Sequence, residues 1–312
     1  MGATVAHVTV RLSVRTSVWR SQIARTVNQV DGLVPVVKGN GYGFGRLRLA
    51  EMAAEFCDTV AVGTIHELDG LPQELTAVVL TPTLVAPPTT DPILTVGREE
   101  HLDALEGWAG RVIVKLATEL RRYGGSVSLI EQARAAGLDV VGVAAHPPIA
   151  GADTDRLRQI SGALVDVDPS VPVWLSHLGV DAYRSLSDGR TYRLRVGTEL
   201  WHGDKSALHL TADVLDVRPV AAGSTAGYHQ DVVETDGHLV MIGAGTANGV
   251  TPLADGRSPF HFARTRLALH EGPHMHTSMA FVPSGDPLPV VGDDVDVQRP
   301  LHMTTVDEYR WL

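Results

Sequence analysis

Hydrophobic positions over the first two thirds of the chain follow two alternating patterns. Short runs rich in Val, Ile and Leu, such as LVPVVK and RVIVKL, are typical of strands buried on both faces, and segments such as TDRLRQISGALV have the spacing of amphipathic helices. Eight such runs alternate mostly with helical segments, which indicates parallel βαβ units and favours a (β/α)8 TIM barrel over an open doubly wound sheet. The expected strands cover residues 33–38, 59–64, 77–81, 93–97, 111–116, 139–145, 171–176 and 192–197.

The pattern changes after about residue 204. Helical periodicity gives way to Gly, Pro and His residues and to short strand-like runs such as HLVMIG and DVDVQRP, separated by turn sequences such as ADGRSP and PSGDP. This texture is typical of a small, mostly antiparallel β domain. We therefore expect the barrel to cover residues 10–205, and the β domain to cover residues 206–312 together with residues 1–9.

Composition narrows the class of protein. The 312 residues are 44% hydrophobic, enough for a folded core, and 26 Lys and Arg against 36 Asp and Glu give a net charge of −10. An acidic chain without a basic run argues against nucleic-acid binding, and no apolar stretch approaches the ~20 residues of a membrane span. The single cysteine, Cys57, and a start without a signal-like apolar core predict a cytoplasmic protein without disulfides.

One lysine lies where a barrel enzyme would place a reactive group. Lys38 ends the first expected strand, directly before the turn GNGYGFG, and barrel active sites lie at the carboxyl ends of the strands. Partial burial there would lower the pKa of the amine and favour a Schiff base, although a strand-end lysine also commonly reaches solvent. Neither GNGYGFG nor IGAGTANG fits the dinucleotide fingerprint GxGxxG, because Phe44 and Asn248 take the place of its last glycine.

The wider sequence around Lys38 resembles a known signature. VVKGNGYGFG is similar to VVKANAYGHG of alanine racemases, the barrel-type (fold type III) pyridoxal-phosphate enzymes. RVIVKLATELRRYG and YRLRVGTELWHG resemble that family's HLKVDTGMGRLG and VRPGIALYG. In the second domain, VAAGSTAGYHQ, IGAGTANGV and PHMHTSMAFV resemble KGETVSYGATY, PIGYADGY and RVCMDQTMVDV. Six matches in chain order identify the sequence as a diverged member of the family.

The resemblance implies a site for pyridoxal 5′-phosphate. Lys38 takes the place of the lysine that forms the internal aldimine and serves as one base, and Tyr42 that of a phosphate-binding tyrosine. Arg195 matches the arginine at the pyridine nitrogen, and Gly197 and Thr198 match residues whose backbone amides bind the phosphate. The other cofactor contacts that the resemblance implies are Ser176 or His177, and His146 near Arg195.

The resemblance also implies a substrate site shared between two subunits. Tyr228 matches the catalytic tyrosine, the base on the opposite face, which the partner subunit donates together with the substrate-contacting Met275. Lys115 matches a lysine that is often carbamylated, and Arg122 matches the arginine that this lysine orients toward the substrate carboxylate. These roles predict a homodimer whose small amino-acid substrate is deprotonated on one face and reprotonated on the other.

The expected function is therefore racemisation of alanine or another small amino acid. Several departures keep alternatives open, because the family's DTGMGR is ATELRR here and the aspartate after Met275 is His276. The same scaffold would also suit another reaction at Cα, such as decarboxylation or elimination, or a non-catalytic homologue that binds the cofactor. A metal-dependent enzyme is a further alternative, whereas the racemase interpretation expects no metal. Its candidate ligands are the closely spaced His261, His270, His274 and His276.

Overall fold

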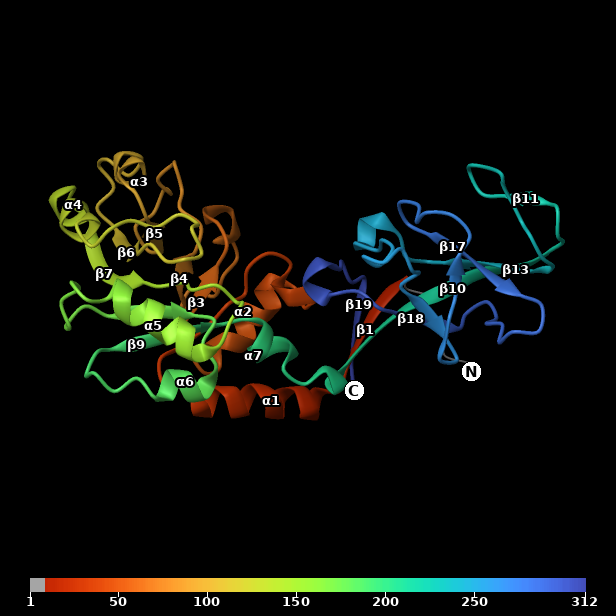
Figure 1. Ribbon diagram of the computed structural model, residues 1–312, viewed down its shortest axis with the longest axis horizontal. Helices are drawn as coiled ribbons and strands as arrows, with labels where there is room; N and C mark the ends of the chain where they lie inside the picture. Colours follow the sequence, from red (N-terminus) through yellow and green to blue (C-terminus); the bar gives the residue numbers. More distant parts are fainter. Residues whose placement is uncertain (1–8) are drawn as a thin grey trace. The chain divides into compact units, whose positions relative to one another are not determined.

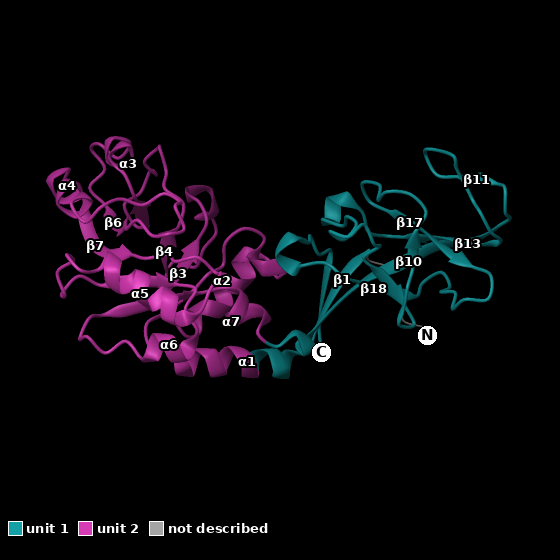
Figure 2. Ribbon diagram, in the orientation of Figure 1, with its two compact units in different colours: residues 1–20, 204–312 teal, residues 21–203 magenta. Residues whose placement is uncertain are grey.

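The computed structural model describes residues 9–312, which form two compact units (Figures 1 and 2). The barrel domain contains Ser21–Gly203, and the β domain contains Asp204–Leu312 with the described residues up to Arg20. Across these described residues, no helix is long and apolar enough to cross a membrane.

The barrel domain is built on eight parallel strands in the order β2-β9-β8-β7-β6-β5-β4-β3. A bridge between Val36 and Ala61, with the Val37 amide donating to the Ala61 carbonyl at 2.9 Å, joins the two end strands and closes the barrel. The expected TIM barrel is confirmed. The strands are β2 (Leu33–Pro35), β3 (Thr59–Val62), β4 (Thr76–Val79), β5 (Ile93–Val96), β6 (Arg111–Lys115), β7 (Asp139–Ala144), β8 (Val173–Ser176) and β9 (Tyr192–Val196).

The interior of the barrel is a packed core. Val34, Ala61, Val78, Ile113 and Trp174 belong to one buried cluster, so side chains from five different strands meet inside the barrel. This explains why the strands are continuous apolar runs with no polar alternation, since both of their faces are covered.

Helices surround the strands, although not every strand is followed by one (Figure 1). After β3 there is only a short 3-10 turn, η2 (Ile65–Glu67). Residues 80–92, between β4 and β5, form no helix because four prolines remove backbone donors and disfavour helical conformations before them. The helices are α1 (Thr16–Gln29), α2 (Arg46–Ala54), α3 (Glu99–Asp103), α4 (Leu129–Ala135), α5 (Asp153–Ala163), α6 (Val180–Arg184) and α7 (Thr198–His202).

The β domain is a mixed sheet that is antiparallel except where β1 pairs with β19. Its expected, mostly antiparallel character is confirmed, and a separate hairpin, β11 with β12, projects from it. The strands are β1 (Val10–Val14), β10 (Leu208–Val220), β11 (Thr225–Ala226), β12 (Asp231–Val232), β13 (Gly237–Ile242), β14 (Phe260–Phe262), β15 (Thr265–Arg266), β16 (Ala268–Leu269), β17 (Ser278–Pro283), β18 (Asp294–Val297) and β19 (Glu308–Trp311). Short 3-10 turns are η1 (Gly41–Gly43), η3 (Lys205–Ala207), η4 (Thr246–Asn248) and η5 (Leu301–Met303).

The start of the barrel differs from the expected boundary at residue 10. Strand β1 belongs to the β domain, because Leu12 pairs with Leu210 of β10 and with Tyr309 of β19. The barrel domain begins only within α1, at Ser21, and ends at Gly203. Residues 1–8, which we assigned to the β domain, lie outside the described residues.

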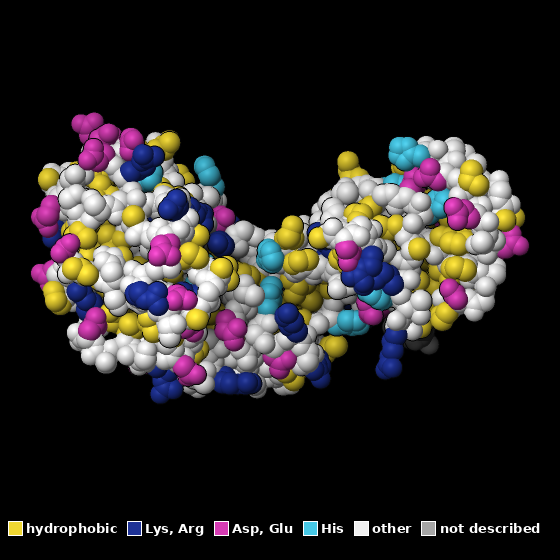
Figure 3. Space-filling view, in the orientation of Figure 1, with side chains coloured by type: hydrophobic (Ala, Val, Ile, Leu, Met, Phe, Trp, Pro, Cys, Tyr) yellow, Lys and Arg dark blue, Asp and Glu magenta, His cyan; other side chains and the backbone are white. Residues whose placement is uncertain are grey.

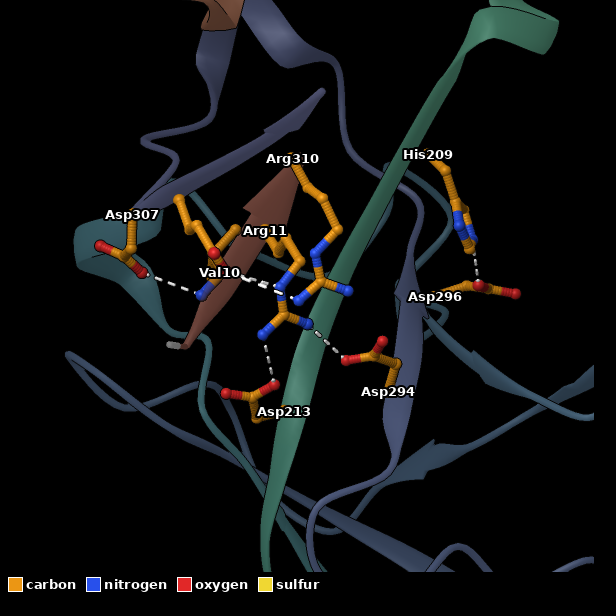
Figure 4. A network of polar contacts seen from close by, with 9 residues as sticks. Val10, Arg11, His209, Asp213, Asp294, Asp296, Asp307 and Arg310 are labelled. Atoms are coloured by element: carbon orange, nitrogen blue, oxygen red, sulfur yellow. Dashed lines mark hydrogen bonds and ion pairs between the residues drawn. The ribbon is translucent and has the colours of Figure 1, made fainter. Parts of the chain in front are cut away.

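A buried charge fixes β1 in this sheet (Figure 4). The Arg11 guanidinium is 3% exposed and bonds carboxylates from three strands: Asp213 of β10 at 3.3 Å, Asp294 of β18 at 2.7 Å and Glu308 of β19 at 2.7 Å. A buried cation needs such partners, since leaving it without them costs several kcal/mol. The N-terminal strand is therefore held by residues some 200 to 300 positions away in the sequence.

Candidate active site

The carboxyl ends of the barrel strands surround a cavity of about 790 Å³, hereafter the barrel cavity. The structure brings together at this cavity every residue that the sequence predicts to bind the cofactor, and their individual roles stay predictions. These residues are Lys38, Tyr42, His146, Ser176, His177, Arg195, Gly197 and Thr198.

A glycine-rich turn after β2 presents Lys38 and Tyr42 to this cavity. Gly41 has φ +62°, and a Cβ atom there would lie 2.4 Å from the backbone nitrogen of Arg46, so only glycine fits. Tyr42 itself has a left-handed backbone, with φ 54°. Lys38 is exposed at the cavity, where desolvation by surrounding protein atoms and the positive charge of Arg122 lower the pKa of its amine. A larger neutral fraction makes this amine a better nucleophile.

Tyr42 and Gly197 meet across the barrel cavity. A Cβ atom at residue 197 would lie only 1.9 Å from the Tyr42 hydroxyl oxygen, so the missing side chain leaves space for this phenol against the backbone. His202 bonds the Tyr42 carbonyl through Nε2 at 2.7 Å and so fixes the turn. Burial raises the pKa of Tyr42 to about 12. The hydroxyl therefore stays protonated at neutral pH and can donate a hydrogen bond to a ligand.

Arg195, on β9, is a buried cation at the floor of this site. It is 7% exposed, and its hydrogen bonds go to the carbonyls of Leu175 at 3.3 Å and of Ala145 and Trp174 at 3.5 Å. Burial lowers the pKa of Arg195 to about 10, which still leaves it charged at neutral pH. Among the residues described, none forms an ion pair with it. The site therefore favours a ligand that presents an acceptor or a negative charge here.

Two histidines form a neutral pair on the cavity wall. The rings of His146 and His177 meet edge to face with their centroids 4.3 Å apart, and Nδ1 of His177 lies 2.9 Å from the Pro147 carbonyl oxygen. His177 has a left-handed backbone, with φ 62°, which is unfavourable for a residue with a side chain. Burial and the Arg195 charge lower the pKa of His146 to about 2, and burial also lowers that of His177. Both rings thus offer neutral donors and acceptors.

Lys115 and Arg122 enclose an aromatic ring that the sequence analysis missed. The Nζ atom of Lys115 lies 4.1 Å from the centroid of Tyr123, and the Arg122 guanidinium carbon lies 4.7 Å from it. Lys115 is 3% exposed; burial, and then the charges of Arg195 and Arg122, lower its pKa to about 7. An aromatic residue directly after two arginines was the available signal.

Arg122 lines a different cavity from the expected cofactor contacts. It is exposed and lines a second cavity, of about 800 Å³, between the loop after β5 and residues 121–128. Arg122 is not among the residues that line the barrel cavity, but it lies near enough to Lys38 for its charge to lower the pKa of that amine.

The two residues expected to serve a partner subunit project from the β domain. Tyr228 lies in the loop between β11 and β12 and is 81% exposed, and Met275 lies in the exposed segment before β17. Such exposure is what a side chain donated to another subunit requires, and their roles stay predictions.

The metal-enzyme alternative finds no support in the part of the chain that the structure describes. Several histidines are visible on the β domain in Figure 3. No group of three or more His, Cys, Asp or Glu side chains there is arranged to hold a metal ion. His274 instead bonds the carboxylate of Glu271 at 2.7 Å.

Known proteins share parts of this sequence and this architecture. Residues 19–166 match the family model described as "Alanine racemase, N-terminal domain". The alanine racemase of Bartonella henselae with covalently bound pyridoxal phosphate superposes with a TM-score of 0.73 at 17% identity, covering 98% of this chain and 100% of that one. The enzymes of Streptomyces lavendulae (TM-score 0.71, 20% identity, 97% of each chain) and E. faecalis (TM-score 0.71, 18% identity, 100% of each chain) are similar. No curated protein matches the sequence.

The barrel followed by a β domain is the fold of alanine racemases. Residues 19–166 carry the similarity to the alanine racemase N-terminal domain, and the structural similarity extends this fold over nearly the whole chain at 17–20% identity.

Proposed function

We propose that this chain is a pyridoxal-phosphate enzyme that racemises a small amino acid. The observation that carries the proposal is the barrel cavity, in which a lysine amine of lowered pKa, a protonated tyrosine and a buried arginine converge, and this arginine has no carboxylate partner within residues 9–312. The family match, and the pyridoxal phosphate bound covalently in the Bartonella henselae enzyme, support the choice of cofactor.

The residues of the cavity suit the parts of this cofactor. Lys38 supplies the amine for covalent attachment. The Tyr42 hydroxyl, the backbone amides of Gly197 and Thr198, and Ser176 or His177 line the cavity and would hold the phosphate. Arg195 keeps its own proton near neutral pH, so it would donate a hydrogen bond to the ring nitrogen of a bound cofactor and disfavour protonation of that nitrogen. When bound, the cofactor supplies an electron sink for negative charge at the substrate Cα.

Racemisation needs two groups that move a proton on opposite faces of Cα. Lys38 serves one face, and Tyr228 of the partner subunit serves the other. The exposure of the Tyr228 side chain on the β domain supports this assignment, because a group that acts in another subunit must project from its own. The enzyme is accordingly a homodimer with shared sites, in which Met275 of the partner subunit contacts the substrate.

Lys115 is proposed as a carbamylated lysine. Carbamate formation needs the neutral amine as nucleophile toward carbon dioxide, and burial that brings the pKa of Lys115 to about 7 supplies that form at neutral pH. The product would be an anion between Arg122 and Arg195, whose charges lower the pKa of the free amine. Its formation would therefore convert a repulsive contact into an attractive one.

One observation favours a second candidate, a different reaction at Cα on the same cofactor. Arg122, the expected contact for the substrate carboxylate, lines the second cavity rather than the barrel cavity. A decarboxylase or an eliminating enzyme would hold the carboxylate differently, and a non-catalytic homologue would not need to hold it.

A spectroscopic and isotopic experiment tests the proposal. Purified protein is supplied with pyridoxal phosphate, reduced with borohydride and digested, and the cofactor adduct is mapped among the three lysines of the chain, Lys38, Lys115 and Lys205. Deuterium incorporation at Cα is then measured for a panel of L- and D-amino acids. An adduct at Lys38 with exchange in both enantiomers of one amino acid supports a racemase, and carbon dioxide or ammonia release without inversion supports the second candidate. No adduct at Lys38 refutes both.

A further inference from the structure

The loop that carries Tyr228 is fastened to the β domain by one buried carboxylate. Glu271 is 8% exposed, and its Oε2 accepts a hydrogen bond from the backbone amide of Tyr228 at 2.9 Å. A Cβ atom at the preceding Gly227, where φ is +81°, would lie 2.5 Å from this carboxylate. The carboxylate thus approaches the loop backbone where only glycine is tolerated.

A histidine connects the same carboxylate to the tyrosine ring. His274 donates from Nε2 to Oε1 of Glu271 at 2.7 Å, and its ring meets the Tyr228 ring at 61° with the centroids 4.5 Å apart. Its Nδ1 lies 3.4 Å from the hydroxyl of Thr277. One histidine therefore has an ionic partner on one side and the aromatic ring on the other.

The carboxylate is held in its charged form. Burial by itself would raise the pKa of Glu271, but hydrogen bonds from His274 and from the backbone amides of Tyr228 and His229 more than offset burial and lower it. Such bonds to a charged group are about twice as strong as neutral ones, so the arrangement is well defined.

The contacts from Glu271 and His274 restrain Tyr228 although its side chain is exposed. An aromatic side chain that is 81% exposed in a glycine-rich loop would ordinarily sample several rotamers. Here the backbone amide of Tyr228 is hydrogen-bonded to Glu271 and its ring contacts His274, while most of the phenol is exposed. Fixed direction together with exposure is what a proton-transfer group needs if it reacts outside its own domain.

We propose that Glu271 and His274 are a positioning pair that orients Tyr228 for proton transfer in the active site of a partner subunit. This inference rests on the proposed function, in which Tyr228 serves one face of Cα. Neither residue touches the substrate; both act through Tyr228, one on its backbone and the other on its ring.

Three variants of the holoenzyme separate the contacts. His274→Phe keeps the ring contact and removes the bond to Glu271, His274→Gln keeps a donor and removes the ring, and Glu271→Gln keeps an acceptor for the Tyr228 amide and removes the charge. The matched control is His209→Phe, which breaks a histidine–carboxylate pair of the same domain, with Asp296 at 2.6 Å, that is exposed to solvent. Thermal unfolding measures whether each variant is folded, and absorbance measures whether the cofactor is attached.

The readout is Cα deuterium exchange measured separately from each enantiomer. A displacement of about 1 Å can cost on the order of 100-fold in rate, so we expect His274→Phe and Glu271→Gln to slow exchange from the Tyr228-side enantiomer by about 10- to 100-fold. Exchange from the Lys38-side enantiomer should change by less than about 2-fold, with His274→Gln intermediate and His209→Phe unchanged.

The outcomes distinguish this inference from the function on which it rests. Equal slowing of both enantiomers, or no slowing beyond the His209→Phe control, overturns the positioning role alone. Absence of exchange in the unaltered holoenzyme with every amino acid overturns the proposed function and this inference with it. If His274→Phe fails to fold, Glu271→Gln and His274→Gln decide between these outcomes by the same criterion.

Discussion

Two buried arginines, one in each domain, have hydrogen-bond partners of different charge. Arg11 in the β domain bonds three carboxylates, whereas the hydrogen bonds of Arg195 in the barrel go to neutral carbonyls at 3.3 to 3.5 Å. Their pKa values differ accordingly. Burial lowers the pKa of both arginines, but the bond to Glu308 and the charges of Asp294 and Asp213 raise the pKa of Arg11 above its usual value. The pKa of Arg195 falls to about 10.

The contrast separates a structural charge from a functional one. A cation that is neutralised within the fold holds strands together, and a cation that is left partly uncompensated beside a cavity has the capacity to bind a ligand. Lys115 and Lys38 belong to the second kind, because the charges nearest to them include Arg122 and Arg195. Positive charge therefore accumulates around Lys38 and Lys115 before any ligand is present, although Asp153, Asp181 and Glu199 also line the barrel cavity.

The largest effect is expected from Lys38→Ala, which removes the proposed attachment point. Exchange at Cα should fall by about 10⁴-fold or more, and the borohydride-reducible absorbance should disappear. Lys205→Ala, in the β domain, is the control and should leave both signals intact. A reducible adduct that persists in Lys38→Ala would mean that the accumulated charge of the cavity does not mark the attachment site.

Arg11→Met tests the structural half of the comparison. Removing the guanidinium leaves three carboxylates facing one another, and breaking a buried ion pair costs about 3–5 kcal/mol. We expect the free energy of unfolding of the β domain to fall by that amount in urea denaturation. A loss smaller than ~1 kcal/mol would show that the network of Figure 4 contributes little to stability.

Arg195→Met tests the functional half. Replacing a partly compensated buried charge by an apolar side chain is often neutral or stabilising, so the unfolding midpoint of the protein without cofactor should stay the same or rise. Exchange at Cα should nevertheless fall on the order of 100-fold, because a donor to the bound cofactor is lost. Strong destabilisation with unchanged exchange would reverse the assignment of the two arginines.

The smallest effect is a pH dependence that arises from Lys115. Its pKa is about 7 in the folded protein against 10.5 as the ordinary value, so between these values the unfolded chain binds the extra proton. Stability must therefore rise with pH across this window. The unfolding midpoints of wild type and Lys115→Met, compared at pH 7 and pH 9, should diverge in favour of wild type at the higher pH. Parallel midpoints would mean that Lys115 is protonated or carbamylated throughout.

Local pattern predicted most of the barrel. Each of the eight expected apolar runs overlaps a barrel strand, because burial on both faces produces a continuous apolar run whatever lies around it. The strand at Val10–Val14 was assigned to the wrong domain. Its alternation of apolar Val10, Leu12 and Val14 with polar Arg11 and Ser13 departs from the continuous apolar runs of the barrel strands, and in the β domain the polar Arg11 is buried against carboxylates.

In the candidate site, too, some features follow from the local sequence and others only from the tertiary structure. The sequence determined which residue types stand at the ends of the strands, and with them the glycine turn that presents Lys38 and Tyr42, because these depend on neighbours within a few positions. Only the tertiary structure decided that Lys115 and Arg122 both contact the Tyr123 ring, and that Glu271 and His274 contact Tyr228. The balance of charge around a buried group depends on residues that are distant in the chain, and folding alone determines which of them become neighbours.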